Sequence, residues 1–277
     1  MVFISKKASI LYMGLLVPLF FVTFVHGLSQ NNQLLMFMGC VLFILFTWLI
    51  KKNVYSEIES INSLLLNDLK INDYINFYVY ASRTKNKKRS LVMKSALLQG
   101  YLAKGDFEKA TPLFYEVRKN INTLNNPEVN INLLVSCTNY LLYTNQHNEA
   151  YELLTLLDAS IKNPSVTYIN KEEIFHNLKL KFMCATNQLT SIDEFNCFLQ
   201  KTNIPLTKVE LKFFLGNFFE ANNNIESAFD EYKYVAKSGG DLYIAQLSKL
   251  KLEHLGNSTK NIKQEGTNQG TAQGNNK

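Results

Sequence analysis

Cysteine and histidine are the side chains most often used for metal binding and nucleophilic chemistry, and this 277-residue chain spaces them poorly for either. The four histidines lie far apart, and no two of them stand at the short spacing of metal ligands. The four cysteines lack the C-x-x-C spacing of metal and redox sites. We therefore expect free thiols, and histidines in ordinary packing or surface roles, at these positions: His26, His147, His176, His254, Cys40, Cys137, Cys184 and Cys197.

The motifs of common active sites are also missing from the sequence. It contains no G-x-x-x-x-G-K-[ST], G-x-G-x-x-G, H-E-x-x-H or G-x-S-x-G. Two carboxylate pairs, Glu172-Glu173 and Asp193-Glu194, stand where helices are expected to begin. Attraction to the positive end of the helix dipole explains acidic side chains at such places. We expect no catalytic residue, no cofactor and no metal ion, and the sequence favours a protein that is not an enzyme.

One cluster of charge stands out, the basic run of Arg83, Lys85, Lys87, Lys88 and Arg89. It is either a solvated loop between helices or a contact with anionic lipid headgroups, where each basic side chain contributes about 1 kcal/mol. Nucleic acid is a weaker alternative because no aromatic residues are interleaved with the charges. The basic excess of the chain lies within its first 90 residues, so the remainder lacks the charge of a nucleic-acid-binding domain.

Two uncharged apolar stretches precede the basic run. Residues 8–25 and 34–50 are each close to the ~20 apolar residues that cross a bilayer, and the polar segment 26–33 separates them. Lysines flank the pair at 6–7 and 51–52 but are missing from the turn, so the positive-inside rule places both termini and the main domain in the cytoplasm. The alternative is a cleaved signal peptide over 1–27, which leaves the main domain on the same side.

The sequence beyond these stretches predicts helices. Beyond Val54 the apolar residues recur at intervals of three and four, which is the helical period. Turn-forming residues at 125–127, 163–164, 204–205 and 239–240 divide this region into segments of roughly 35 to 40 residues, enough for two helices and a turn. We found no alternating strand pattern. The sequence predicts an all-α fold in which a two-helix transmembrane hairpin is followed by a solenoid of helix pairs.

Several segments resemble the tetratricopeptide repeat. One copy carries Leu97, Leu98, Tyr101, Gly105, Asp106, Phe107, Ala110, Phe114 and Val117, and another carries Leu215, Gly216, Phe219, Ala228, Tyr232 and Val235. Two further copies are weaker, one with Leu141, Asn145, Ala150, Leu154 and Leu157, and one with Met183, Asn187, Ile192 and Leu199. The resemblance covers about residues 91–237. It implies that the small residues lie where the two helices of a pair approach most closely.

The expected organisation has five parts. They are a cytoplasmic N-terminus at 1–7, the transmembrane hairpin at 8–50, a juxtamembrane helical linker with the basic run at 51–90, a helical repeat domain with a capping helix at 91–255, and a disordered polar tail at 256–277. The tail is rich in Asn, Gln, Gly and Thr and has too little apolar surface to order itself.

The resemblance also implies a binding groove, because in this family the first helix of each pair lines a concave surface that binds extended peptides. The equivalent inward position of the four copies carries Gln99, Asn139, Lys181 and Asn217, and neighbouring inward positions carry Ser95, Asn132, Asn177 and Glu210. Amide side chains among them can bond a peptide backbone as donor and acceptor. Their frequency is equally explained by the abundance of asparagine in this chain.

These observations lead to one principal functional prediction. The chain is expected to be a membrane-anchored adaptor or scaffold that presents its groove to a protein or peptide on the cytoplasmic side, with membrane lipid as a further contact and no nucleic acid. The alternatives are a regulatory protein that senses a peptide and an enzyme of unrecognised type. The last would require ionisable groups that converge in a cleft, and the sequence offers none.

Overall fold

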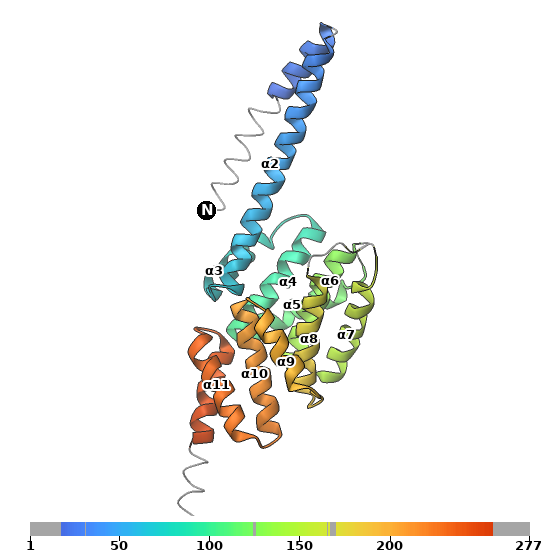
Figure 1. Ribbon diagram of the computed structural model, residues 1–277. Coiled ribbons are helices and arrows are strands. Elements are labelled where there is room, and N and C mark those ends of the chain that lie inside the picture. Colours follow the sequence, from blue (N-terminus) through green and yellow to red (C-terminus); the bar gives the residue numbers. More distant parts are fainter. Residues whose placement is uncertain (1–17, 31, 124–125, 165, 167–169, 257–277) are drawn as a thin grey trace, which may run out of the picture. The chain divides into compact units, whose positions relative to one another are not determined.

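A computed structural model describes residues 18–30, 32–123, 126–164, 166 and 170–256 (Figure 1). Every element of regular structure in these residues is a helix, which agrees with the all-α prediction. The chain forms two compact units, residues 1–63 and 64–277. The predicted tail was 256–277; Gly256 belongs to the last helix, and residues 257–277 lie outside the described residues.

The first unit contains a helical hairpin. A helix over 18–29 is followed, after a short turn, by the long helix α2, Gln33–Leu66. The two helices run antiparallel, because the rings of Phe20 and Phe43 lie 5.0 Å apart and Gly39 faces Thr23 and Phe24. The predicted hairpin shape is therefore present.

The prediction that both helices span a membrane is wrong. Among the described residues no helix combines the length and apolar character needed to cross a bilayer. The apolar part of α2 reaches about 26 Å before Lys51 and Lys52, which is less than the ~30 Å of a hydrocarbon core. The placement of the termini and main domain in the cytoplasm depended on these spans and is withdrawn with them. Residues 8–17 of the expected first span lie outside the described residues.

The second unit is repeat-like, with helices arranged as consecutive pairs (Figure 1). The first helices, α4, α6, α8 and α10, pack against one another in chain order, and each is followed by a second helix. The helices are α3 Ile71–Ala81, α4 Lys87–Lys104, α5 Phe107–Lys119, α6 Pro127–Tyr143, α7 His147–Ile161, α8 Lys171–Ala185, α9 Ile192–Lys201, α10 Pro205–Ala221, α11 Ile225–Ser238 and a C-terminal helix over 243–256.

The same turn ends each of the four first helices. One residue after each helix adopts the left-handed conformation, with φ between 57° and 77°, at Gly105, Asn145, Asn187 and Asn223. The amide of this residue donates to the carbonyl three residues earlier, and the next amide donates to the carbonyl five residues before itself. These bonds satisfy carbonyls that a helix end leaves unpaired. Glycine and asparagine occupy these positions because they tolerate positive φ at little cost.

The small residues of the repeat pattern lie at the fourth position of three second helices. Ala110, Ala150 and Ala228 are fully buried there. The third pair differs, because Ile192 is the first residue of α9 and 42% exposed, while Phe195 fills the fourth position and is buried. The longer turn before α9 causes this shift, so Ile192 is not the counterpart of the three alanines.

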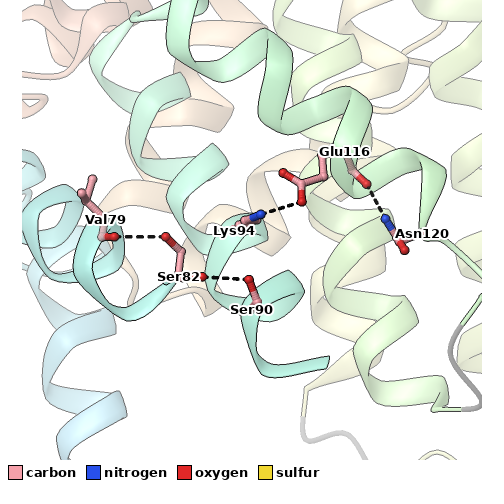
Figure 2. A network of polar contacts seen from close by, with 6 residues as sticks. All are labelled: Val79, Ser82, Ser90, Lys94, Glu116 and Asn120. Carbon is pink, nitrogen blue, oxygen red and sulfur yellow. Dashed lines mark hydrogen bonds and ion pairs between the residues drawn. The ribbon is translucent and has the colours of Figure 1, made fainter. Parts of the chain in front are cut away.

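Polar contacts tie the first elements of the second unit together (Figure 2). Lys94 Nζ of α4 lies 2.5 Å from Glu116 Oε1 of α5, and the Ser90 hydroxyl donates to the carbonyl of Ser82 at 2.8 Å. Ser90 belongs to α4, and Ser82 follows α3. These bonds connect three successive helices near the exposed surface.

Replacing Ala228 by Leu should test the close approach of α10 and α11. A larger side chain at this fully buried position should overpack the pair and lower the free energy of unfolding by about 1–3 kcal/mol. The measurement is chemical denaturation of the full chain followed by circular dichroism. The matched control is Ala221→Leu at the exposed end of α10, which should change stability by no more than about 0.5 kcal/mol. Equal effects of the two substitutions would contradict the proposed packing.

Candidate functional site

Four of the predicted groove residues form one continuous line of contacts, which we call the polar row. It consists of Gln99, Asn139, Lys181 and Glu210, one residue from each of the first helices α4, α6, α8 and α10. Asn139 Nδ2 donates to Gln99 Oε1 at 3.4 Å, and Lys181 Nζ donates to Asn139 Oδ1 at 3.2 Å. Lys181 Nζ also lies 2.6 Å from Glu210 Oε2. The row therefore connects all four first helices.

Lys181 is the most deeply buried member of the polar row. Its side chain is 1% exposed, and that of Glu210 is 12% exposed. A buried ammonium ion is tolerated only when it is paired and hydrogen-bonded, and Asn139 and Glu210 meet that requirement. The row thus neutralises its own charge within the stack.

Tyr143 completes the row at the Glu210 end. Its hydroxyl donates to Glu210 Oε1 at 2.9 Å. Burial first, then the negative charge of Glu210 and this hydrogen bond, raise the pKa of Tyr143 well above its usual value. The tyrosine therefore stays protonated at neutral pH and serves as a donor, so both carboxylate oxygens of Glu210 have partners.

The other four predicted groove residues lie in three different places. Ser95 is buried on α4 and Asn132 is half-buried on α6, and the hydroxyl of Ser136 lies within hydrogen-bond distance of both of their carbonyl oxygens. Asn177 has a buried Oδ1 for which no donor is found among the described residues. Asn217 belongs to a separate cluster near the end of the chain.

That separate cluster is one that the sequence analysis missed. The Tyr232 hydroxyl lies 2.8 Å from Asn217 Oδ1 and 2.6 Å from Glu220 Oε2, and Lys251 Nζ bonds the same carboxylate oxygen. The Tyr232 hydroxyl has one proton, which it donates to the Glu220 carboxylate. If the side-chain oxygen and nitrogen of Asn217 exchange places, its amide group can donate to the Tyr232 hydroxyl oxygen. Lys251 Nζ also stands 5.1 Å from the centre of the Tyr232 ring. The Leu215-Gly216 motif marked part of this cluster, but nothing in the sequence pointed to Lys251.

Gly216 explains how the Tyr232 ring reaches this position. A Cβ atom on Gly216 would lie 2.7 Å from Tyr232 Cε1, so the ring occupies the space that any other residue would fill. Burial, followed by the hydrogen bond and charge of Glu220, raises the pKa of Tyr232 above its usual range. The phenol therefore remains protonated.

The basic run lies in the segment before α4 and in the first turn of α4. All five side chains are exposed, and no ion pair is found for them among the described residues. Lys87, Lys88 and Arg89 occupy the first turn of α4, which contains no acidic residue. Cations there face the positive end of the helix dipole. The lipid contact predicted for the run remains an untested prediction.

The remaining candidates for chemistry form no site. Cys137 and Cys184 are buried, and burial raises the pKa of each thiol to about 12, which suppresses the reactive thiolate. Cys40 and Cys197 are exposed. Within the part of the chain that the structure describes, no three His, Cys, Asp or Glu side chains gather as metal ligands would.

Replacing Lys181 by Met should show how strongly the polar row stabilises the stack. The substitution leaves Glu210 largely buried without its cation, so the free energy of unfolding should fall by about 3 kcal/mol. Adding Glu210→Gln to the variant should recover part of that loss. The matched control is Lys179→Met, an exposed lysine on the same helix. Chemical denaturation of the full chain measures all three variants, and equal stability of the Lys181 and Lys179 variants would contradict this interpretation.

The Glu220 cluster should make stability depend on pH in the acid range. Burial disfavours the Glu220 carboxylate, but hydrogen bonds from Lys251 and Tyr232 and the nearby His254 outweigh it and hold the pKa below its ordinary value of 4.5. A lowered folded-state pKa stabilises the fold above pH 4.5, and that contribution is lost as the pH falls through the folded-state value.

Denaturation at pH 7 and pH 3 would measure this dependence. Glu220→Gln should lose less stability than the unsubstituted chain between the two values, whereas Glu226→Gln at an exposed position should behave like the unsubstituted chain. An unchanged pH dependence in the Glu220 variant would exclude the linkage.

Comparison with protein-family models gave no match, and comparisons with curated proteins and with solved structures gave none either. The tetratricopeptide resemblance accordingly depends on the residue pattern alone and remains a prediction, beside a fold that is helical and repeat-like.

Proposed function

We propose that this chain is a protein-interaction scaffold without catalytic activity, built on the helix pairs of the second unit. The observation that carries the proposal is that four first helices pack in chain order and that each contributes one polar side chain to a single bonded row. Stacked helix pairs form an extended surface that a protein segment can follow across several helices. Such a surface needs rigidity and recognition groups but no convergence of reactive side chains.

The ends of the polar row favour contact with an extended segment. Gln99 and Glu210 are partly exposed, whereas Asn139 and Lys181 are buried between them. The buried members hold the helices in register, and the partly exposed members are accessible to a partner. A partner's backbone amides and carbonyls can bond both kinds of atom in the Gln99 side chain.

The second helices offer a competing surface. Tyr115 on α5 is 64% exposed and Tyr151 on α7 is 60% exposed. Tyrosine is enriched in protein interfaces because it combines a large apolar ring with a hydroxyl. The experiment must therefore distinguish the first-helix side from the second-helix side.

Site-specific photo-crosslinking in cells tests the proposal. A photoreactive amino acid would replace Gln99 or Asn132 on the first helices, and Tyr115 or Tyr151 on the second helices, in the full chain. We expect Gln99 and Asn132 to yield discrete products with the same partner, and the two tyrosine positions to yield none. Products from the tyrosine positions alone would transfer the interface to the second helices. An absence of discrete products from all four folded variants would overturn the scaffold proposal.

A further inference from the structure

The C-terminal helix over 243–256 contacts a helix pair far from it in the chain. The ring of Tyr243, at its first position, packs edge-on against Phe107 with 5.5 Å between ring centres. Phe107 is the first residue of α5, directly after the turn that contains Gly105. In a simple solenoid each repeat contacts only its neighbours, so this contact between the last helix and the first repeat-like pair is unexpected.

Gly105 permits this contact for a reason unrelated to its backbone conformation. A Cβ atom on Gly105 would lie 2.6 Å from Cγ and 3.0 Å from Cβ of Tyr243. Turning the ring about its own axis leaves Cγ and Cβ in place, so the Tyr243 side chain would have to leave this position.

The other three turns show that positive φ alone does not require glycine. Asn145, Asn187 and Asn223 occupy the equivalent left-handed position with φ between 57° and 58°. Only the turn that faces Tyr243 has glycine at this position among the four. The absence of a side chain at Gly105 is therefore explained by the approach of Tyr243.

The remainder of the C-terminal helix is attached to the last pair. Lys251 binds Glu220 of α10 and lies over the ring of Tyr232 of α11. Leu242 and Ala245 are buried, and Ala245 lies close to Gly239 at the end of α11. One short helix thus holds both the last pair and the first pair.

We propose that the C-terminal helix is a clasp whose Tyr243 ring docks on Gly105 and Phe107, and which joins the first and last repeat-like pairs into a closed stack. Undocking of Tyr243 releases the α4–α5 turn while Lys251 keeps the helix on the last pair. The surface beside Gly105 is in this view a docking site for an aromatic side chain, filled by a segment of the same chain. The inference does not depend on the proposed function, because its test measures local opening and not partner binding.

Hydrogen–deuterium exchange of the full chain tests the clasp. Gly105→Asn keeps a residue that the three equivalent turns accept, but it adds the Cβ atom that displaces Tyr243. We expect amide exchange to rise at least about tenfold at the first turn of helix 243–256 and at the α4–α5 turn, with exchange in the central helix α6 unchanged. The reverse substitution Asn145→Gly is the matched control and should leave both segments unchanged.

A second variant keeps the test valid if Gly105→Asn fails to fold. Tyr243→Ala removes the same contact without adding an atom to the turn, and it should raise exchange in the same two segments. Adding Gly105→Asn to Tyr243→Ala should then have no further effect, because both substitutions break one interaction. Exchange that stays at the unsubstituted rate in Tyr243→Ala, or that rises equally in α6, would overturn the proposal.

Discussion

The ammonium group of Lys181 is the constraint on which the arrangement of the first helices depends. It is enclosed between α6 and α10, where an unpaired charge would be very costly. Asn139 and Glu210 must therefore approach it together, and Glu210 in turn requires the hydroxyl of Tyr143. A shift of α6, α8 or α10 along its axis would break at least two of these bonds at once. Apolar side chains alone would tolerate such a shift more easily, so the row defines the register of the stack.

The left-handed turns impose a second constraint, because they fix the point at which each first helix stops. The hydrogen bonds around Gly105, Asn145, Asn187 and Asn223 follow the same pattern in all four pairs. Three of the row residues, Gln99, Asn139 and Lys181, lie six residues before this turn, whereas Glu210 lies thirteen residues before it. The polar row forms from residues that are far apart in the sequence. Turn chemistry and the buried charge thus act on the same feature of the fold.

Much of the helical architecture could be predicted from sequence, since the period of apolar residues and the small residues Ala110, Ala150 and Ala228 report local packing. Gln99, Asn139, Lys181 and Glu210 could also be singled out from the sequence, although as groove residues and not as partners of one another. Their mutual bonding could not, because it depends on how far the stack curves. The contact of Tyr243 with Gly105 could not be predicted either, because the left-handed turn already explained glycine at that position.

The prediction of two membrane spans was wrong because hydropathy and helix length are separate requirements. Hydropathy measures the composition of a segment, whereas crossing a bilayer requires an apolar helix of sufficient length. The apolar residues of α2 form one part of a helix that continues through Lys51 and Lys52 to Leu66.

The proposed scaffold would have to hold its shape while it binds, and the second unit has contacts at two levels that serve this purpose. The polar row holds neighbouring first helices together, and the C-terminal helix holds the first and last pairs together. The first level is buried and charged, so it resists separation of adjacent helices. At the second level the proposed clasp holds the first pair only by the Tyr243 ring beside a glycine, so this contact opens at a lower free energy than the buried row, while Lys251 keeps the helix on the last pair. Curvature of the stack can therefore change without loss of its register.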